Sequence, residues 1–346
     1  MERVKFCLIG AGRAGMVHAR NIIENVPSAD LVCIVEPNVD AARKISLETG
    51  VTRCYSSLED AIRNVDFDAV IIATPTYTHA ELTKIAASAG KHVFCEKPMA
   101  LNLKEAEEMI QACKDNNVKL QIGFMRRFDD SFLRAKEAIE NREIGEVILV
   151  KSTGRGPHLP PRWACNPKIS MGMLAEVNSH DFDSIRWLTN SEFSKVYAEA
   201  GTFKCFELSR EFPSFYDSAI VLLRLKNGVL GIVDGSCPVN YGYDARVEIL
   251  GTEGAIFIGG LQETMLTICT REYRMVMPIF QSWRTRFKDA YVREIRHFVD
   301  CILEDREPTV TGEDGKKIVE VVLAATKSIL SGEPIKLPLQ GDIELF

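Results

Sequence analysis

The first third of the chain alternates short apolar segments with segments in which apolar residues recur at helical spacing. The apolar segments predict strands at Val4–Ile9, Ala29–Val35, Ala69–Ala73, His92–Cys95 and Leu120–Ile122. The segments between them predict helices over Gly15–Val26, Val39–Thr49, His79–Ala89 and Leu103–Asn116. Strands that alternate with helices are typical of βαβ crossovers. We therefore expect an α/β domain over residues 1–122, with a doubly wound parallel sheet of the Rossmann type.

Beyond residue 123 the pattern changes to longer strands with alternating apolar and polar positions. Strands are predicted at Glu146–Thr153, Lys195–Gly201, Ser218–Leu225, Val229–Ser236 and Ala245–Gly251, and helices at Asp130–Asn141, Met173–Leu188, Tyr291–Glu304 and Lys316–Leu330. The turn Lys226-Asn227-Gly228 predicts a hairpin between two of the strands. We expect residues 123–346 to form an α+β domain with a large, mostly antiparallel open sheet.

Length and composition narrow the class of protein. A chain of 346 residues exceeds what one hydrophobic core usually serves, which supports two domains. The net charge of -6 disfavours nucleic acid partners and favours a small-molecule substrate. A membrane partner is not expected, because no apolar run is long enough to span a membrane. The chain has no long apolar run and no signal-peptide pattern at its start, so a cytoplasmic location is expected. Its ten cysteines include no C-x-x-C pair, and we expect no metal site.

A glycine-rich loop predicts a dinucleotide site. The segment Gly10-Ala11-Gly12-Arg13-Ala14-Gly15 follows the first strand and opens a helix, which is the context of a pyrophosphate-binding turn. Glu36 ends the second strand, where a carboxylate can bind the adenosine ribose hydroxyls and would repel a 2'-phosphate. NAD is therefore favoured over NADP. Arg13 and Arg43 leave NADP open, since either could approach a phosphate.

Two further motifs follow strands of the same predicted sheet. The segment Thr74-Pro75-Thr76-Tyr77-Thr78-His79 comes after the third strand, and Glu96-Lys97-Pro98 comes after the fourth. The carboxyl ends of parallel strands form the ligand-binding edge of such sheets. Thr74, Pro75, His79, Glu96 and Lys97 are therefore candidate cofactor contacts. A residue before proline is held extended, and the Lys97-Pro98 bond can be cis.

Together, the glycine loop, Glu36, Ala73-Thr74-Pro75-x-x-x-His79 and Glu96-Lys97-Pro98 resemble the glucose-fructose oxidoreductase/inositol dehydrogenase/MocA family. The segment Gly123-Phe124-Met125-Arg126-Arg127-Phe128-Asp129 resembles the family's entry into its second domain. Tyr241-Gly242-Tyr243-Asp244-x-Arg246-Val247-Glu248 resembles inositol dehydrogenase members in particular. The resemblance implies an NAD-dependent dehydrogenase that forms homodimers or homotetramers.

The catalytic candidates are Lys97, Glu176 and His180. In a helix over Met173–Leu188, Glu176 and His180 would be four residues apart on one face. A histidine that titrates near neutral pH is a natural general base, and Glu176 could orient it or bind a second hydroxyl. The resemblance implies that Lys97 contacts the substrate hydroxyl and the nicotinamide ribose, and that His180 accepts the proton. Asp183 is a further candidate for fixing the histidine.

The predicted reaction is oxidation of a secondary hydroxyl of a cyclic polyol, sugar or glycoside to a ketone. Related inositol dehydrogenases usually carry aspartate where this chain has Glu176, so oxidation of a glycoside to a 3-keto product stays open. An NAD-using glycosidase with internal hydride return, a keto-sugar reductase and a non-catalytic dinucleotide-binding regulator are the alternatives. Substrate contacts are expected from residues around a proline-stiffened loop and nearby segments: Arg127, Arg155, His158, Trp163, Asn178 and Tyr241.

Overall fold

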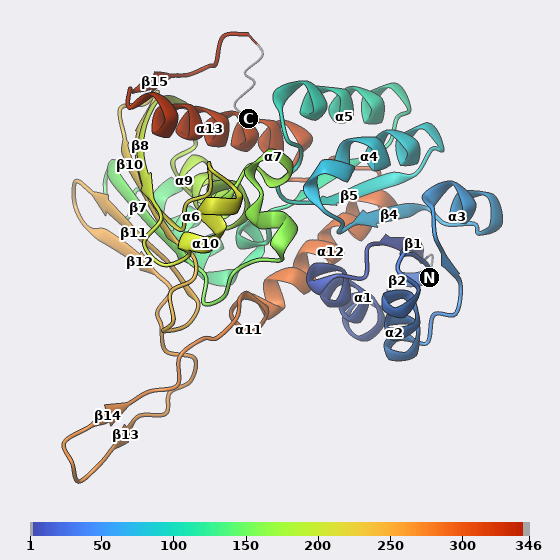
Figure 1. Cartoon of the computed structure of the whole chain (residues 1–346), viewed down its shortest axis with the longest axis horizontal. Helices are drawn as coiled ribbons and strands as arrows, with labels where there is room; N and C mark the ends of the chain where they lie inside the picture. Colours follow the sequence, from blue (N-terminus) through green and yellow to red (C-terminus); the bar gives the residue numbers. More distant parts are fainter. Residues whose placement is uncertain (1–2, 342–346) are drawn as a thin grey trace. The chain divides into compact units, whose positions relative to one another are not determined.

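The computed structural model describes residues 3–341 and divides into two compact units (Figure 1). The first contains residues 3–128 and 289–319, and the second contains 129–288 and 320–341. The expected ranges 1–122 and 123–346 include residues 1–2 and 342–346, which lie outside the described part. They also assign 289–319 to the second domain. The structure instead packs Phe298, from that segment, against Phe6 and Phe94 of the first unit.

The first unit contains a six-stranded sheet in the order β3-β2-β1-β4-β5-β6, and all of its pairs are parallel. Its strands are β1 (Val4–Ile9), β2 (Ala29–Val35), β3 (Cys54–Tyr55), β4 (Ala69–Ile72), β5 (His92–Glu96) and β6 (Leu120–Gly123). Its helices are α1 (Arg13–Asn25), α2 (Val39–Thr49), α3 (Leu58–Asn64), α4 (His79–Ser88), α5 (Leu103–Asp115) and α12 (Lys288–Leu303). The predicted doubly wound sheet is confirmed.

The second unit contains a seven-stranded sheet in the order β12-β11-β7-β10-β9-β8-β15. Its strands are β7 (Val147–Arg155), β8 (Phe193–Gly201), β9 (Ser218–Leu225), β10 (Leu230–Ser236), β11 (Asp244–Gly251), β12 (Ala255–Ile258) and β15 (Ile335–Lys336). Only β7 and β10 pair in parallel within this described sheet, so the prediction of a mostly antiparallel sheet is confirmed. β9 and β10 form the predicted hairpin.

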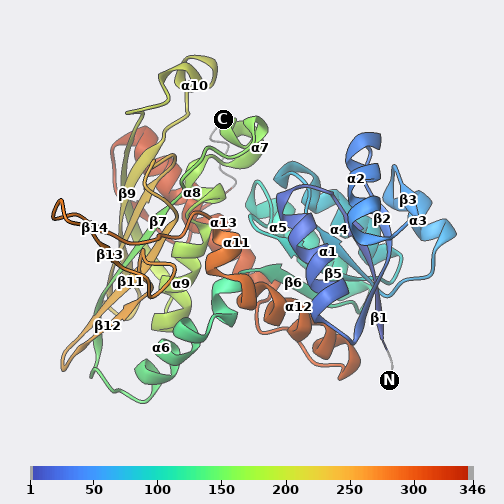
Figure 2. The ribbon, with the colours of Figure 1, turned by 90° about the horizontal axis from the view of Figure 1, so that it is seen from below.

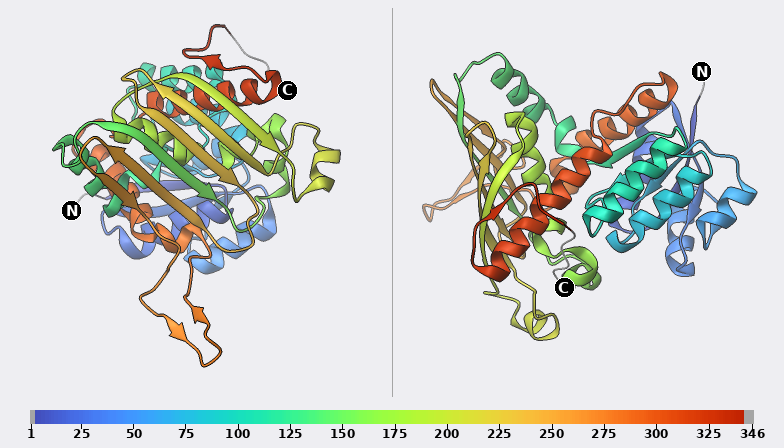
Figure 3. Two further views of the ribbon diagram at one scale, coloured as in Figure 1. Left: turned by 90° about the vertical axis from the view of Figure 1, so that its left-hand side faces the viewer. Right: turned by 90° about the horizontal axis from the view of Figure 1, so that it is seen from above.

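Helices cover one face of this sheet and leave the other open. Figure 2 shows α6 (Asp130–Glu140) and α9 (Ser179–Thr189) on the covered side, and the left view of Figure 3 shows the face without helices. The backbone N–H of Ala198 in β8 donates to Ser328 Oγ of α13 (Gly312–Ser331), which joins that helix to the covered face.

The second unit differs from the prediction at its short elements. A long hairpin projects from the sheet and contains β13 (Ile268–Cys269) and β14 (Met275–Val276) (Figure 1). The expected helix over Met173–Leu188 is two helices, α8 (Met173–Glu176) and α9. The remaining short helices are η1 (Thr76–Thr78) and η2 (Met125–Phe128) in the first unit, and η3 (Arg162–Cys165), α7 (Pro167–Ser170), α10 (Phe206–Glu211) and α11 (Trp283–Arg286) in the second.

Candidate active site

The glycine loop between β1 and α1 has the backbone geometry that its sequence predicts. Gly10 has a φ of 96°, and a side chain there would place Cβ 2.7 Å from the carbonyl oxygen of Ala73. A Cβ at Gly15 would lie 2.0 Å from the carbonyl oxygen of Gly10. Gly12 precedes α1 without a side-chain cap, which leaves the first N–H groups of the helix available to a pyrophosphate.

Glu36 is tied to this loop by its own carboxylate. Its Oε2 accepts a hydrogen bond of 2.8 Å from the backbone N–H of Ala11, and its Oε1 accepts one of 2.9 Å from Asn38. Each carboxylate oxygen can accept a further bond, so the group can still bind ribose hydroxyls. Arg13 and Arg43 are exposed. The residues present therefore fit NAD.

His79 joins the two loops that follow β4 and β5. Its Nε2 lies 2.9 Å from the carbonyl oxygen of Thr74, and its Nδ1 lies 2.9 Å from that of Pro98. The ring is buried, and burial lowers the pKa of His79. Because both nitrogens contact backbone carbonyls, the ring positions Thr74, Pro75 and the Lys97-Pro98 corner instead of reaching outward to a cofactor.

Glu96 also faces into the protein. Its Oε1 lies 2.7 Å from Nε2 of buried His18, and its Oε2 accepts a bond of 3.2 Å from the backbone N–H of Lys97. Burial acts to raise the pKa of Glu96, but the bond to His18 and the charges of His18 and Lys97 leave it below its usual value. Glu96 thus fixes the backbone of half-buried Lys97, which precedes a cis Lys97-Pro98 bond.

In the second unit, a buried cluster fixes the start of α9, whose first turn carries His180. The side-chain amide of Asn178 donates to the carbonyl oxygen of Gly154 (3.0 Å) and to Asp181 Oδ2 (2.8 Å). Ser152 Oγ donates to Asp181 Oδ1 at 2.6 Å. A Cβ at Gly154 would lie 2.0 Å from Asp181 Oδ2, so glycine makes the close approach to the sheet possible.

This cluster corrects two expectations. α8 ends at Glu176 and α9 begins at Ser179, so Glu176 and His180 do not share the face of one continuous helix. Asn178 lies at the break, and its side-chain amide donates to the carbonyl oxygen of Gly154 in β7. Asn178 was expected to contact substrate, but it is fully buried and its amide nitrogen is bound within the protein. Asp183 is buried in α9, His180 is 6% exposed, and Glu176 is half-buried.

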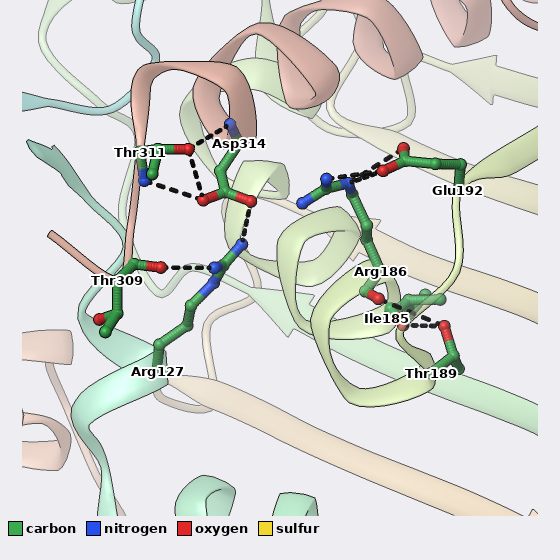
Figure 4. Close-up of polar contacts among 8 residues, drawn as sticks. All are labelled: Arg127, Ile185, Arg186, Thr189, Glu192, Thr309, Thr311 and Asp314. Carbon is green, nitrogen blue, oxygen red and sulfur yellow. Dashed lines mark hydrogen bonds and ion pairs between the residues drawn. The ribbon is translucent and has the colours of Figure 1, made fainter. Parts of the chain in front are cut away.

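Arg127, another expected substrate contact, is instead held within the first unit. Its Nη2 lies 3.1 Å from Asp314 Oδ1, and its Nη1 donates to the carbonyl oxygen of Thr309 at 3.3 Å (Figure 4). Asp314 Oδ2 also accepts bonds from the backbone N–H and hydroxyl of Thr311 (Figure 4). The guanidinium and the carboxylate are both largely buried, so this ion pair ties η2 to the start of α13.

Arg155 and Tyr241 lie on the open face of the second sheet, opposite to α9. Side chains alternate along a strand, and Ser152 faces α9, so Arg155 faces the other way. Arg155 forms two bonds to Asp234, at 3.0 and 2.6 Å, and a third to the Tyr241 hydroxyl at 3.2 Å. The carboxylate of Asp234 raises the pKa of Arg155. These residues line a broad pocket on that face, which also includes Lys204.

Two of the expected substrate contacts, His158 and Trp163, lie in the segment that follows β7 and stay predictions. His158 is exposed and Trp163, in η3, is half-buried, so both side chains are accessible.

Within residues 3–341, no helix is long and apolar enough to cross a membrane. No cluster of histidine, cysteine and carboxylate side chains in the same range has the arrangement of a metal site.

Comparison with known families covers both units. Residues 4–124 match the Gfo/Idh/MocA oxidoreductase family, NAD-binding Rossmann fold, and residues 136–337 match the C-terminal alpha/beta domain of the same family. The chain belongs to the Gfo/Idh/MocA oxidoreductase family. The predictions of this family, of an NAD-dependent oxidoreductase and of NAD as its cofactor are therefore confirmed.

Relatives resemble this oxidoreductase over nearly its full length. A myo-inositol 2-dehydrogenase of Thermotoga maritima is 34% identical over 330 residues, which cover 95% of this chain and 97% of the relative. A scyllo-inositol 2-dehydrogenase (NAD(+)) of Bacillus subtilis is 35% identical over 344 residues, or 98% of each chain. The structure of a Lactobacillus casei scyllo-inositol dehydrogenase with bound NAD(H) and scyllo-inositol aligns with a TM-score of 0.90 at 28% identity, covering 97% of this chain and 99% of that one.

The ion pair of Arg127 with Asp314 yields a stability prediction for this family member. Replacing Arg127 with methionine should lower the free energy of unfolding by about 3–5 kcal/mol, because Asp314 would be left buried without its cation. Urea denaturation of the parent and of Arg127→Met measures the difference in the free energy of unfolding. Arg142→Met, in an exposed pair with Glu146, is the control and should leave stability unchanged. Unchanged stability together with a raised KM would place Arg127 on the substrate instead.

Proposed function

We propose that this oxidoreductase oxidises a secondary hydroxyl of an inositol to a ketone. The observation that carries the proposal is the similarity, over at least 95% of the chain, to dehydrogenases named for myo-inositol and scyllo-inositol. The nucleotide loop and Glu36 supply the matching cofactor site. The relatives are named as dehydrogenases, so they do not favour a glycosidase or a non-catalytic regulator.

Proton handling in this proposal belongs to Lys97 and His180. NAD, when bound, accepts the hydride that leaves the carbinol carbon. His180 accepts the hydroxyl proton as the hydride leaves, and the Lys97 ammonium stabilises the negative charge that develops on the oxygen. Glu176 binds a neighbouring hydroxyl of the inositol. His158 and Trp163, in the segment that follows β7, contact the inositol ring. We also propose that the unit with the parallel sheet binds NAD and that the other unit supplies the substrate contacts.

NADH absorbance during turnover tests the proposal. Purified protein is supplied with NAD and, in separate reactions, with inositols, free sugars and glycosides. NADH formation with myo-inositol or scyllo-inositol is the expected result. A response confined to glycosides would move the substrate class to the 3-keto alternative, and turnover of a glycoside without NADH would indicate internal hydride return.

A change at Glu36 should alter cofactor choice. Glu36→Ala is expected to lower the preference for NAD over NADP, in kcat/KM, by about tenfold or more, because the charge that binds the ribose and repels a 2'-phosphate is lost. Loss of loop order alone would weaken both cofactors equally, so an improvement with NADP identifies the charge effect. The exposed Asp40→Ala in α2 is the control. If the ratio of NAD to NADP activity stays at the parental value, Glu36 does not set the choice.

We further propose that the chain forms a homo-oligomer through the open face of the second sheet. This face exposes large apolar side chains at Ile220, Leu222, Leu230, Leu250 and Phe257, by 41% to 73%. Apolar groups gathered on one surface are typical of an association site. Light scattering should give the mass of a dimer or tetramer, and Leu222→Glu should lower it. A monomeric parent protein would contradict this proposal.

A further inference from the structure

A buried polar cluster lies beneath the Glu96-Lys97 corner, on one face of the six-stranded sheet. In the register of β5 with β6, Phe94 pairs with Gln121 and Glu96 pairs with Gly123. These four side-chain positions share a face because residues two apart along a strand point the same way. A Cβ at Gly123 would lie 3.2 Å from Glu96 Oε2, so the missing side chain gives room to the carboxylate.

Helix α12 covers this face and brings a second carboxyl group to it. The Phe298 ring lies 6.0 Å from that of Phe94, and the Tyr291 ring lies 5.8 Å from that of His18. Glu294 is one turn from each of these α12 residues and therefore points to the same side. The backbone carbonyl oxygen of Glu294 accepts a hydrogen bond of 3.1 Å from Gln121 Nε2, which places this turn of the helix against β6.

The carboxyl group of Glu294 is fully buried and has no hydrogen-bond partner among residues 3–341. Within the same described range, Gln121 Oε1 and His18 Nδ1 are also buried without a partner. Buried polar atoms of proteins nearly always have partners, and enclosed water commonly supplies them. Gln121 binds the backbone of Glu294, and His18 packs on Tyr291 one turn away, so the residues with these unpaired atoms meet at one part of α12. Buried unpaired atoms of this kind fit a small enclosed site for water.

Two ionised carboxylates would repel each other in such a site. Glu96 has His18 and the N–H of Lys97 to stabilise its charge, whereas Glu294 has neither. Burial, and then the neighbouring charge of Glu96, raise the pKa of Glu294 well above its usual value. These surroundings favour a proton on Glu294 over one on Glu96.

We propose that Glu294 is a positioning residue for Lys97. Its neutral carboxylic acid donates a hydrogen bond to an enclosed water, the water donates to the carboxylate of Glu96, and Glu96 holds the backbone N–H of Lys97. The effect on turnover rests on the proposed function of Lys97, whereas the protonated acid and its water do not. Glu294 adds no second negative charge beneath Lys97.

Infrared spectroscopy tests the proton on the whole enzyme at neutral pH. A carbonyl-stretch band of a protonated carboxylic acid should be present in the parent and absent in Glu294→Gln. Asp289→Asn changes an exposed acid of the same helix and should retain the band, which makes it the matched control. A parent spectrum that lacks this band overturns the proposal.

Kinetics then separate positioning from packing. Glu294→Gln keeps a polar donor of the same size, and kcat with myo-inositol should stay within about threefold of the parent. Glu294→Leu removes the hydrogen bond, and kcat should fall about tenfold while the dissociation constant for NAD stays unchanged. Parental kcat in Glu294→Leu, or an equal loss in Glu294→Gln, overturns the positioning role.

The infrared and kinetic experiments can fail independently, so they separate the role of Glu294 from the proposed function. If the parent forms no NADH from any inositol, the proposed function fails, whereas the infrared band still decides whether Glu294 holds a proton. If Glu294→Leu does not fold, the band and the kcat of Glu294→Gln decide the proposal. A Glu294→Gln enzyme that folds, retains parental NAD binding and loses more than about tenfold in kcat contradicts it.

Discussion

Replacing His180 with alanine is expected to lower kcat for inositol oxidation by about 10²- to 10⁴-fold, the usual effect of losing a general base. The imidazole is the group that we propose accepts the hydroxyl proton, and methyl cannot take that role. NAD binding should be unchanged, because the nucleotide loop and Glu36 belong to the other unit. Steady-state kinetics and NAD titration of the variant measure both quantities.

The control for this change is the neighbouring residue in the same helical turn. Ser179 is buried, and its hydroxyl makes no hydrogen bond within the described chain. Ser179→Ala should therefore retain kcat. Parental activity in His180→Ala would remove His180 from the reaction, and equal losses in both variants would indicate damage to the start of α9 instead of a lost base.

Replacing Lys97 with methionine should also lower kcat by two or more orders of magnitude. Methionine keeps much of the apolar stem but removes the ammonium that we propose stabilises the developing charge. The backbone N–H of Lys97, which binds Glu96, is kept. The melting temperature and the dissociation constant for NAD should therefore change little, while turnover falls.

Lys104→Met is the matched control, because Lys104 is exposed at the start of α5. It should show parental kinetics. Parental turnover in Lys97→Met would show that the reaction does not use this ammonium. A fall in the melting temperature as large as the fall in activity would assign Lys97 to structure.

Most elements of the first unit were predictable because their signals are local. Strands of a parallel sheet are buried on both faces and appear as continuous apolar runs, which is why β1 and β2 have the predicted bounds. β3 has two residues and α3 has seven, and such short elements leave little periodic pattern. The glycine loop and Glu36 were likewise readable from neighbouring residues.

The second unit shows where local patterns fail. At the break between α8 and α9, Asn178 donates to Gly154, a residue 24 positions earlier in the chain. The spacing of apolar residues along Met173–Leu188 does not indicate that contact. The projecting hairpin with β13 and β14 exposes apolar residues such as Met265 and Tyr273, so its sequence does not resemble an ordinary surface loop.

Partners distant in sequence also explain the site residues whose contacts differ from expectation. Asp314, which holds Arg127, and Asp234, which holds Arg155, follow them by 187 and 79 positions. His18 was missed because nothing near it in α1 indicates that its ring meets Glu96, 78 residues later. Residue type identified polar groups that could bind a ligand. Only the fold shows which of these groups are already bound to other residues of the chain.

The path of the hydride from inositol to NAD tests the proposed oxidation. The enzyme is supplied with NAD and myo-inositol deuterated at every ring carbon, and the dinucleotide product is analysed by mass spectrometry. The proposed oxidation should give NADH that carries one deuterium and an inositol product that has become a ketone. No reduced dinucleotide, or reduced dinucleotide without deuterium, would contradict it.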